Sequence, residues 1–501
     1  MGRREFDRVA PESVGIPSTA IERLLDCLGD GSTEMHGLMI MRRGKVCAEG
    51  WWAPYGPGIR HGCQSLSKTY AATAVGTAYT EGLLRLDERI IDIFPDETPR
   101  TPSENLRKLR VRDVLCMGCG MDEMPKPSQD WIRDFLAIPV QHEPGTTFMY
   151  NSMGSTLLGA IVQRKTGQGL HEWLKSHLFD KIGIDADNLR WIRMPDETEV
   201  GGGGLFSTTE DNLRLMCLYN HLGLWEGERI LAEDYVRLAT SKQNDSSSER
   251  KCNPPAEDNF LGYGFQIWMC RPEGAYRADG AMGQFSIVFP RQDLIVAINE
   301  TAKDAIWAQR TLDTVYDVLL PSVVGSELPS DTEAYARLRK RLESLAIPCP
   351  RYAPRSPTAG SVSGKRFEVT RGQLRLRMGS FMAPTAEAGT VTAFRFEFSA
   401  GNCTLSIEES GKALRLEVGI DGTRRLNLLQ PSGTPETMLY LSGSWMSEAS
   451  FELIARWVET CFERRIVFAF SQGRVLIKNE VAVGFSFPSA PSDATIEAVE
   501  C

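Results

Sequence analysis

The chain has 501 residues, of which 42% are hydrophobic and 24% are charged, and its formal net charge is −9. This length exceeds one ordinary hydrophobic core and predicts two or three domains, and the composition excludes a disordered or fibrous protein. The acidic balance argues against a nucleic-acid partner.

The cellular compartment is predicted from the start of the chain and from its cysteines. Residues 1–7 lack the apolar run of a signal peptide, and no apolar stretch is long enough to span a bilayer. The twelve cysteines are scattered, and the one Cys-x-x-Cys, from Cys116 to Cys119, has no second ligand pair for zinc. We therefore expect a cytoplasmic protein with reduced thiols, no membrane contact and no metal.

The first part of the chain, residues 1–322, is predicted to form one domain. A hairpin is expected over 37–49, and helices are expected over 67–81 and 152–165, each followed by a glycine where a C-terminal cap belongs. The small Ala and Thr residues of the first helix suit a buried position. A run of four glycines at 201–204 predicts a loop that needs close backbone approach.

Further along, a helix is predicted over 210–222, and strands return after it. One strand is expected over 262–268, a hairpin over 284–298, and a closing helix over 305–320. Strands at both ends with helices between them indicate an antiparallel sheet with helical layers, an α/β fold of the α+β type.

The character of the chain changes after residue 322. A charged helix over 332–345 and a Pro/Ser-rich stretch at 348–357 make 323–362 a predicted helix and linker. Over 363–501 apolar and polar residues alternate with period two. This pattern predicts a separate all-β domain, either a barrel or a sandwich.

Ser65 and Lys68 stand three residues apart at the start of a predicted buried helix. Residues at this spacing share one helix face, so the ammonium and the hydroxyl can meet. A serine hydroxyl needs a base to become a nucleophile, and a partly desolvated lysine near a helix N-terminus has a lowered pKa that suits this role. The Ser65 backbone N–H can also point at an oxyanion. The alternative reading is a helix cap beside a surface lysine.

Four segments of the first domain stand in a characteristic order: Gln64-Ser65-Leu66-Ser67-Lys68, Phe148-Met149-Tyr150-Asn151-Ser152, Gly202-Gly203-Gly204-Leu205-Phe206-Ser207 and Tyr276-Arg277-Ala278-Asp279-Gly280-Ala281-Met282-Gly283-Gln284. Together they resemble the class C β-lactamase and penicillin-binding-protein superfamily over about residues 10–322. The chain is most similar to the esterase-like and amidase-like serine hydrolases of that superfamily, which include the nylon-oligomer hydrolases. The resemblance implies a β-lactamase-like fold for this domain.

The resemblance also implies roles for single residues. Ser65 matches the nucleophile, Lys68 its partner, and Tyr150 the tyrosine that moves a proton on and off the serine and the leaving group. Whether Lys68 or Tyr150 is the main base is left open. The family commonly has Tyr-x-Asn, whereas this chain has Tyr150-Asn151-Ser152. Asn151 and Ser152 are therefore both candidate substrate-binding residues, with the amide contact supplied by Ser152 or missing.

The third motif, commonly Lys-Thr-Gly or His-x-Gly in the family, is Ala278-Asp279-Gly280 here. The resemblance implies that Gly280 leaves room for the substrate beside its strand and that the Ala281 N–H is the second oxyanion donor. Asp279 either caps a turn, which we favour, or faces a cationic group of the substrate. Gly280 and Asp279 are thus further candidate substrate-binding residues.

The third motif lacks the cation that would hold the carboxylate of a β-lactam, so weak or absent β-lactamase activity is expected. Arg277 is the one nearby replacement. Adjacent side chains of a regular strand point to opposite faces, so Arg277 is expected to reach the site only if the strand bulges.

The predicted function is hydrolysis of an ester or amide bond of a small substrate through a Ser65 acyl-enzyme, without a metal or organic cofactor. The alternatives are a penicillin-recognising D-peptidase or β-lactamase, and a non-catalytic binding protein on the same fold. The chain has no Gly-x-Ser-x-Gly and no convincing P-loop or dinucleotide motif. The expected partner is a small ester, amide or peptide, with no nucleic acid or membrane, and a homo-oligomer is left open.

Overall fold

The computed structural model describes residues 5–31, 33–248, 255–377, 389–409, 411–431, 435–483 and 495–501. The chain divides into two compact units, Met1–Ala346 and Ile347–Cys501. Across the described residues, no helix combines the length and the apolar character that a membrane crossing requires.

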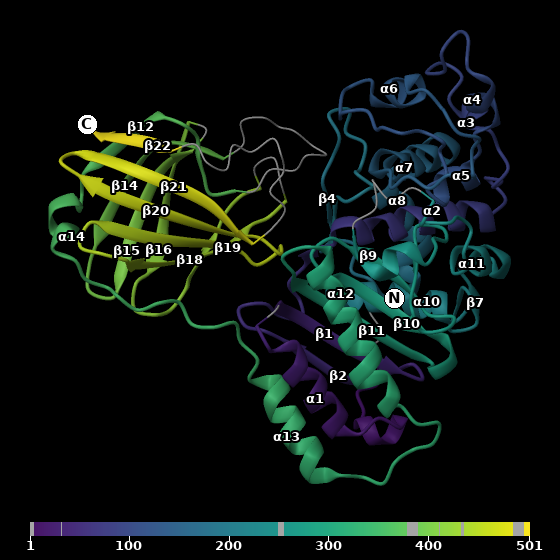
Figure 1. Cartoon of the computed structure of the whole chain (residues 1–501), viewed down its shortest axis with the longest axis horizontal. Helices are drawn as coiled ribbons and strands as arrows, with labels where there is room; N and C mark the ends of the chain where they lie inside the picture. The colour runs from purple at the N-terminus through teal and green to yellow at the C-terminus, as the bar shows by residue number, and fades with distance from the viewer. Residues whose placement is uncertain are drawn as a thin grey trace. The chain divides into compact units, whose positions relative to one another are not determined.

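A six-stranded antiparallel sheet forms the centre of the first unit (Figure 1). Its strand order is β2-β1-β11-β10-β9-β8, so the N-terminal hairpin pairs with strands from the end of the unit. The strands are β1 (Glu34–Arg42), β2 (Lys45–Trp51), β8 (Trp268–Met269), β9 (Tyr276–Gly280), β10 (Gln284–Phe289) and β11 (Leu294–Thr301).

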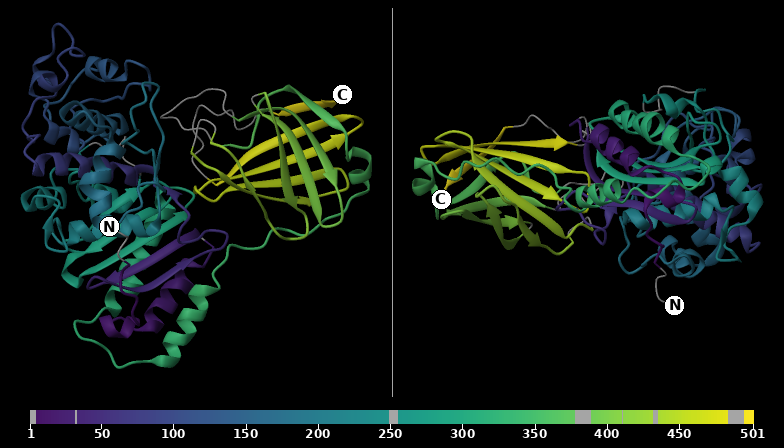
Figure 2. Two further views of the ribbon diagram at one scale, coloured as in Figure 1. Left: turned by 180° about the vertical axis from the view of Figure 1, so that it is seen from behind. Right: turned by 90° about the horizontal axis from the view of Figure 1, so that it is seen from below.

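Both faces of this sheet are covered by helices. Leu38 and Ile40 of β1 belong to the core that includes α1 (Ser18–Leu28), and α12 (Ala305–Thr314) packs against α1 (Figure 2). Gly37, one residue along, faces α10 (Thr209–Asn220) instead. Because both faces are buried, β10 and β11 are mostly apolar instead of alternating.

The helical part of the unit is built around α2 (Ser67–Thr80), which packs against α7 (Ser152–Thr166). A Cβ at Gly76 would lie 2.5 Å from the Tyr235 ring, so small residues let α2 approach its neighbours closely. The remaining helices are α3 (Ile90–Ile93), α4 (Glu104–Lys108), α5 (Val111–Leu115), α6 (Trp131–Ala137), α8 (Leu170–Leu174), α9 (Asp180–Ile182), α11 (Glu233–Ala239) and α13 (Thr332–Glu343).

Short strands complete the unit. β3 (His61–Gly62), β5 (Leu205–Ser207) and β4 (Arg190–Trp191) form a small sheet, and β6 (Leu224–Trp225) pairs with β7 (Glu228–Arg229). The pairing of β3 with β5 brings the segment just before Ser65 beside the segment that follows the glycine run.

Two predicted elements are shorter than expected. The strand over 262–268 is reduced to β8, because Gln266 has a φ of 55° and donates from its backbone and side chain to the Leu115 carbonyl. The helix over 305–320 continues beyond Thr314 only as a wider π turn and a 3-10 turn. Pro321, which has no N–H to donate, ends the regular pattern.

The second unit is a closed β-barrel, one of the two predicted all-β architectures. It closes because β12 pairs with both β22 and β14. Phe396 packs on Phe468 and Phe451 with ring centroids 5.0 and 5.4 Å apart, so aromatic side chains fill the interior. The strands are β12 (Arg366–Arg371), β13 (Leu374–Arg375), β14 (Thr390–Phe398), β15 (Asn402–Glu409), β16 (Lys412–Gly419), β17 (Arg425–Leu428), β18 (Met438–Trp445), β19 (Ser450–Trp457), β20 (Glu463–Ser471), β21 (Arg474–Val483) and β22 (Ile496–Glu500).

The segment predicted as a helix and linker, 323–362, is shared between the two units. Helix α13 packs against α1 and β2 and therefore belongs to the first unit. Helix α14 (Pro357–Val362) belongs to the second unit. The backbone accordingly divides after Ala346 instead of at residue 322, because the charged helix has an apolar side that the first unit buries.

Candidate active site

Ser65 lies in a 3-10 turn, Gln64–Leu66, that runs directly into α2. The N–H groups of a first helical turn have no intrahelical acceptor, which leaves the Ser65 N–H for another partner. Gln64 has a φ of 50°, and Ser67 Oγ donates to its carbonyl at 2.6 Å. A left-handed residue with a side chain is uncommon and is held by its surroundings, so the turn that presents Ser65 is a constrained one.

Lys68 is buried beneath Ser65, with only 1% of the residue exposed. Its Nζ donates to Ser65 Oγ at 2.9 Å and to Ser152 Oγ at 3.1 Å, and it makes a closer contact with the Gly202 carbonyl. Burial lowers the pKa of Lys68 to about 7, although the Asp279 carboxylate acts in the opposite direction. A group with this pKa, within hydrogen-bond reach of a hydroxyl, meets the requirements of a general base.

The glycine run makes this contact possible. A Cβ at Gly202 would lie 2.2 Å from the Ser152 carbonyl oxygen, and the Gly202 N–H donates to Thr156 Oγ1 at 3.2 Å. The close approach predicted from the four glycines is therefore present, at the point where the loop meets α7. The sequence did not indicate that the Gly202 carbonyl would accept a hydrogen bond from Lys68.

Two contacts of its aromatic ring position Tyr150. Lys68 Nζ lies 4.8 Å from the ring centroid, and the Trp268 ring stacks on Tyr150 with centroids 5.6 Å apart and planes 20° apart. Burial raises the pKa of the Tyr150 phenol, although a hydrogen bond with Ser65 lowers it. The phenol is thus protonated near neutral pH and can donate. Trp268 was not predicted as a site residue, because its only signal in the sequence was an aromatic side chain at the end of a predicted strand.

The two residues after Tyr150 have different surroundings. Asn151 is buried, and its Oδ1 accepts from the Gly154 N–H at 2.8 Å, which makes it the N-cap of α7. Ser152 accepts from Lys68 and lies inside the cluster of polar side chains. Ser152 is therefore the better placed of these two candidates, and Asn151 has a structural role that its cap position explains.

Strand β9 brings Arg277 and Asp279 to one face, because it pairs with β10 without a register shift. Arg277 Nε donates to Asp279 Oδ2 at 2.7 Å. The strand does not bulge here, and Arg277 lies beside Asp279 with 1% of its side chain exposed. The favoured turn-cap role of Asp279 is wrong, because this residue lies within the strand. Burial raises the pKa of Asp279, and the Arg277 charge opposes that shift.

Gly280 and Ala281 follow directly and lead into a tight turn. A Cβ at Gly280 would lie 2.1 Å from the Cys63 carbonyl oxygen, so the space that Gly280 leaves is filled by the segment before Ser65 and not by a substrate. The expectation that Gly280 leaves room for the substrate is therefore corrected: the glycine leaves room for the backbone of Cys63. Ala281 begins the turn to β10, in which Met282 has a φ of 70° and a Cβ at Gly283 would lie 2.0 Å from the buried Glu300 carboxylate.

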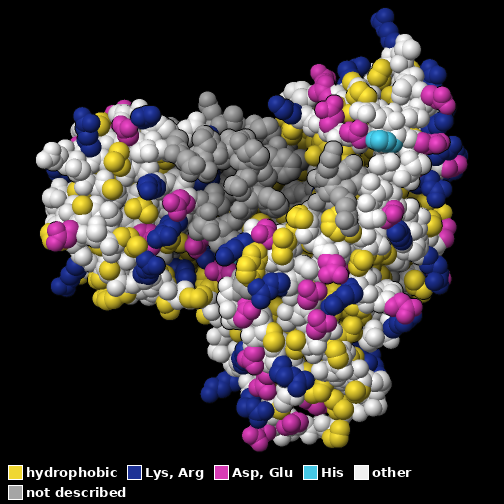
Figure 3. Space-filling model, in the orientation of Figure 1, with side chains coloured by type: hydrophobic (Ala, Val, Ile, Leu, Met, Phe, Trp, Pro, Cys, Tyr) yellow, Lys and Arg dark blue, Asp and Glu magenta, His cyan; other side chains and the backbone are white. Residues whose placement is uncertain are grey.

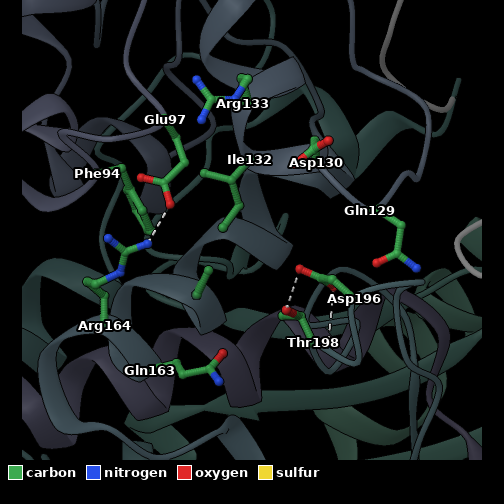
Figure 4. A pocket seen from close by; sticks show the side chains of 11 residues that line it. Phe94, Glu97, Gln129, Asp130, Ile132, Arg133, Gln163, Arg164, Asp196 and Thr198 are labelled. Carbon is green, nitrogen blue, oxygen red and sulfur yellow. Dashed lines mark hydrogen bonds and ion pairs between the residues drawn. The ribbon is translucent and has the colours of Figure 1, made fainter.

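Other features lie away from this cluster. A cavity of about 470 Å³ lies between α6 and the second half of α7, lined by Glu97, Arg164 and Asp196 among others (Figure 4). Its lining includes none of the predicted site residues. Burial raises the pKa of the Cys116 thiol to about 12, which disfavours the thiolate that a metal needs. On the face seen in Figure 3, basic and acidic side chains are interspersed.

The profile of the beta-lactamase family matches residues 20–314, which is more than half of the chain. The chain belongs to the beta-lactamase family. The matched segment contains Ser65, Lys68 and Tyr150 together with β9, and the resemblance inferred from the four motifs is thereby confirmed. The β-lactamase-like fold of the first unit is confirmed as well.

This beta-lactamase-family chain is similar to several named proteins. It is 24% identical over 283 residues to the 6-aminohexanoate-dimer hydrolase of Paenarthrobacter ureafaciens, covering 52% of this chain and 70% of that protein. It is also 24% identical to a putative D-alanyl-D-alanine carboxypeptidase of Escherichia coli (strain K12), over 38% of this chain and 57% of that protein. A penicillin-binding protein homolog from Caulobacter crescentus superimposes with a TM-score of 0.50 at 17% identity, covering 62% of this chain and 99% of that one, which shows the fold alone.

Proposed function

We propose that this protein hydrolyses an ester or amide bond of a small substrate through an acyl-enzyme on Ser65. The contact of 2.9 Å between Lys68 Nζ and Ser65 Oγ carries the proposal. A buried lysine with a pKa of about 7 is a usable base near neutral pH, and a serine in contact with it is an activated nucleophile. Membership of a hydrolase family supports the same conclusion.

In the proposed acylation step, the neutral Lys68 amine takes the proton of Ser65 Oγ while that oxygen forms a bond to the substrate carbonyl carbon. The N–H groups of Ser65 and Ala281 donate to the oxygen that becomes negative. The intermediate then collapses, the bond to the leaving group breaks, and the leaving group takes a proton from Tyr150. Tyr150 recovers its proton from the Lys68 ammonium, so the charges balance.

Deacylation repeats these steps with water as the nucleophile. Water loses a proton to the neutral Lys68 and attacks the acyl carbon. The bond to Ser65 Oγ then breaks, and Ser65 takes its proton from the Lys68 ammonium, which returns the lysine to its neutral form. The products are a carboxylic acid and an alcohol or amine. The order of pKa values favours Lys68 as the base and Tyr150 as the donor, since burial lowers the lysine pKa and raises the tyrosine pKa.

The two other hypotheses are less favoured by particular observations. A penicillin-recognising enzyme would need a cation for the β-lactam carboxylate, and Arg277 is buried and already bonded to Asp279. A non-catalytic binder would gain little from burying Lys68 beneath a serine, because an ammonium is costly to remove from water.

A substrate panel tests the proposal. Wild-type protein is expected to release p-nitrophenol from p-nitrophenyl butyrate or nitroaniline from a short p-nitroanilide, and to turn over nitrocefin weakly or not at all. Ser65→Ala supplies the blank. Equal rates for wild type and Ser65→Ala would overturn the proposed chemistry. Nitrocefin turnover comparable to that of the ester, or durable labelling by a fluorescent penicillin, would favour the penicillin-recognising alternative.

The pH dependence of hydrolysis follows from Lys68. Only the neutral amine can accept the Ser65 proton, and its pKa is about 7, so kcat/KM is expected to rise with pH through neutrality. Because Asp279 raises the pKa of Lys68, Asp279→Asn should move this acid limb to lower pH. Profiles recorded over about pH 5 to 9 test both statements. A limb that is flat through pH 7, or that moves upward in Asp279→Asn, would contradict the assignment of Lys68 as the base.

A further inference from the structure

We propose that the site selects substrates that carry a cationic group, and that Asp279 is the residue that contacts it. This inference rests on the proposed hydrolysis at Ser65 and adds a substrate class to it. The class is an ester or amide with a permanent or protonated amine close to the scissile bond, on its acyl side or its leaving-group side.

Asp279 lies next to the reacting groups. It precedes Gly280, whose backbone is packed against the Cys63 carbonyl two residues before Ser65. Its charge acts on both Lys68 and Tyr150. A substrate group that lies along the end of β9 while its carbonyl is at Ser65 must therefore pass close to the Asp279 carboxylate.

Arg277 is not available to a substrate. Its side chain is 1% exposed, and its three guanidinium nitrogens donate to Asp279 Oδ2 at 2.7 Å, to the Met269 carbonyl at 3.0 Å and to Asn259 Oδ1 at 2.6 Å. A guanidinium with its donors engaged holds the neighbouring carboxylate in place instead of binding a substrate anion. Arg277 is the one cationic side chain of β9, and its donors are all engaged by other residues of the described part of the protein.

The charges around Arg277 leave an excess of negative charge. Asp258 lies 3.9 Å from Arg277 and is itself buried, so two carboxylates share one guanidinium. Of these two, Asp279 is the more exposed, with 19% of its side chain accessible. Its second oxygen, Oδ1, makes no hydrogen bond or ion pair with any residue in the described part of the chain. The uncompensated charge therefore faces the site through Asp279.

Lys68 does not remove this charge at working pH. Its pKa is about 7, so the amine is largely neutral when it acts as a base. A substrate carboxylate would meet the Asp279 carboxylate, and β9 offers it no unengaged cation, whereas a substrate ammonium would meet Asp279 as an opposite charge. Electrostatic complementarity then favours the cationic substrate over a neutral one of the same shape.

Matched esters test this inference at pH 8. One pair, acetylcholine and 3,3-dimethylbutyl acetate, differs only by a charge on the leaving group. The other pair, the p-nitrophenyl esters of 4-(trimethylammonio)butanoate and 5,5-dimethylhexanoate, differs only by a charge on the acyl group. For at least one pair, the ratio of cationic to neutral kcat/KM in wild type is expected to exceed that in Asp279→Asn by about tenfold or more. The ratio of ratios cancels the intrinsic reactivity of the esters.

Asp87→Asn is the control for loss of one negative charge. Asp87 is 64% exposed and follows α2, whereas Ser65 precedes this helix of 14 residues, whose length is about 21 Å. This variant should keep the wild-type ratios. Tetramethylammonium, at constant ionic strength, should inhibit wild-type hydrolysis of the neutral esters competitively, which tests the idea even if Asp279→Asn folds poorly.

The outcomes separate the inference from the proposed function. Ser65-dependent hydrolysis of neutral esters, with ratios that do not change in folded Asp279→Asn or no inhibition by tetramethylammonium, would overturn the cation preference alone. Absence of any Ser65-dependent hydrolysis would overturn the proposed function, and the inference with it.

Discussion

Ser65→Ala is expected to lower kcat/KM for esters on the order of 10⁴-fold or more, because it removes the only atom that can form the acyl-enzyme in the proposed reaction. The variant should also lose covalent labelling by a fluorophosphonate, measured as intact mass. Its folding should be nearly unchanged, because Ser65 is only partly buried and the substitution removes one oxygen.

Ser152→Ala is the matched control for this experiment. Lys68 donates to both serines, at 2.9 Å to Ser65 and 3.1 Å to Ser152, so distance alone does not decide which one is the nucleophile. Ser65 lies in the turn that runs into α2 and is only partly buried, whereas Ser152 is almost fully buried. Ser152→Ala should therefore retain the label. Retention by Ser65→Ala and loss by Ser152→Ala would exchange the two roles.

Lys68→Ala is expected to lower kcat/KM by roughly 10²-fold or more, the usual size for a lost acid–base group. The variant removes the base, and it should also abolish the rise in activity with pH through neutrality. The free energy of unfolding should not fall through loss of an ion pair in this variant. Burial disfavours the charged form of Lys68, and removing the buried amine removes that cost of desolvation. Full activity with an unchanged pH profile would show that another group takes the Ser65 proton.

Tyr150→Phe should lower turnover by a similar factor, roughly 10²-fold, because it removes one hydroxyl. The phenyl ring keeps both ring contacts, with Lys68 at 4.8 Å and Trp268 at 5.6 Å in the native protein. The comparison thus isolates the proton donor from the packing of the ring. If the variant keeps full activity on an ester, the tyrosine is structural.

The sequence by itself predicted the central pair of the candidate site, Ser65 and Lys68. Ser65 and Lys68 are brought together by the helix that contains them, and an i, i+3 spacing needs no long-range contact to be read. The buried character of α2, the close approach at Gly202 and the alternating pattern of the barrel strands were also predictable. Each is a local property of spacing or residue size.

Only the tertiary structure decided what surrounds this pair. The stacking of Trp268 on Tyr150 joins residues more than a hundred positions apart, and no local pattern encodes it. The side-chain partners of Arg277 depend on the regular pairing of β9 with β10 and on the neighbours Asp258 and Asn259. Gly280 was explained by the approach of Cys63 from another segment. Side-chain partners across a sheet are set by how distant segments pack, whereas residue spacing fixes only which face of an element each side chain occupies.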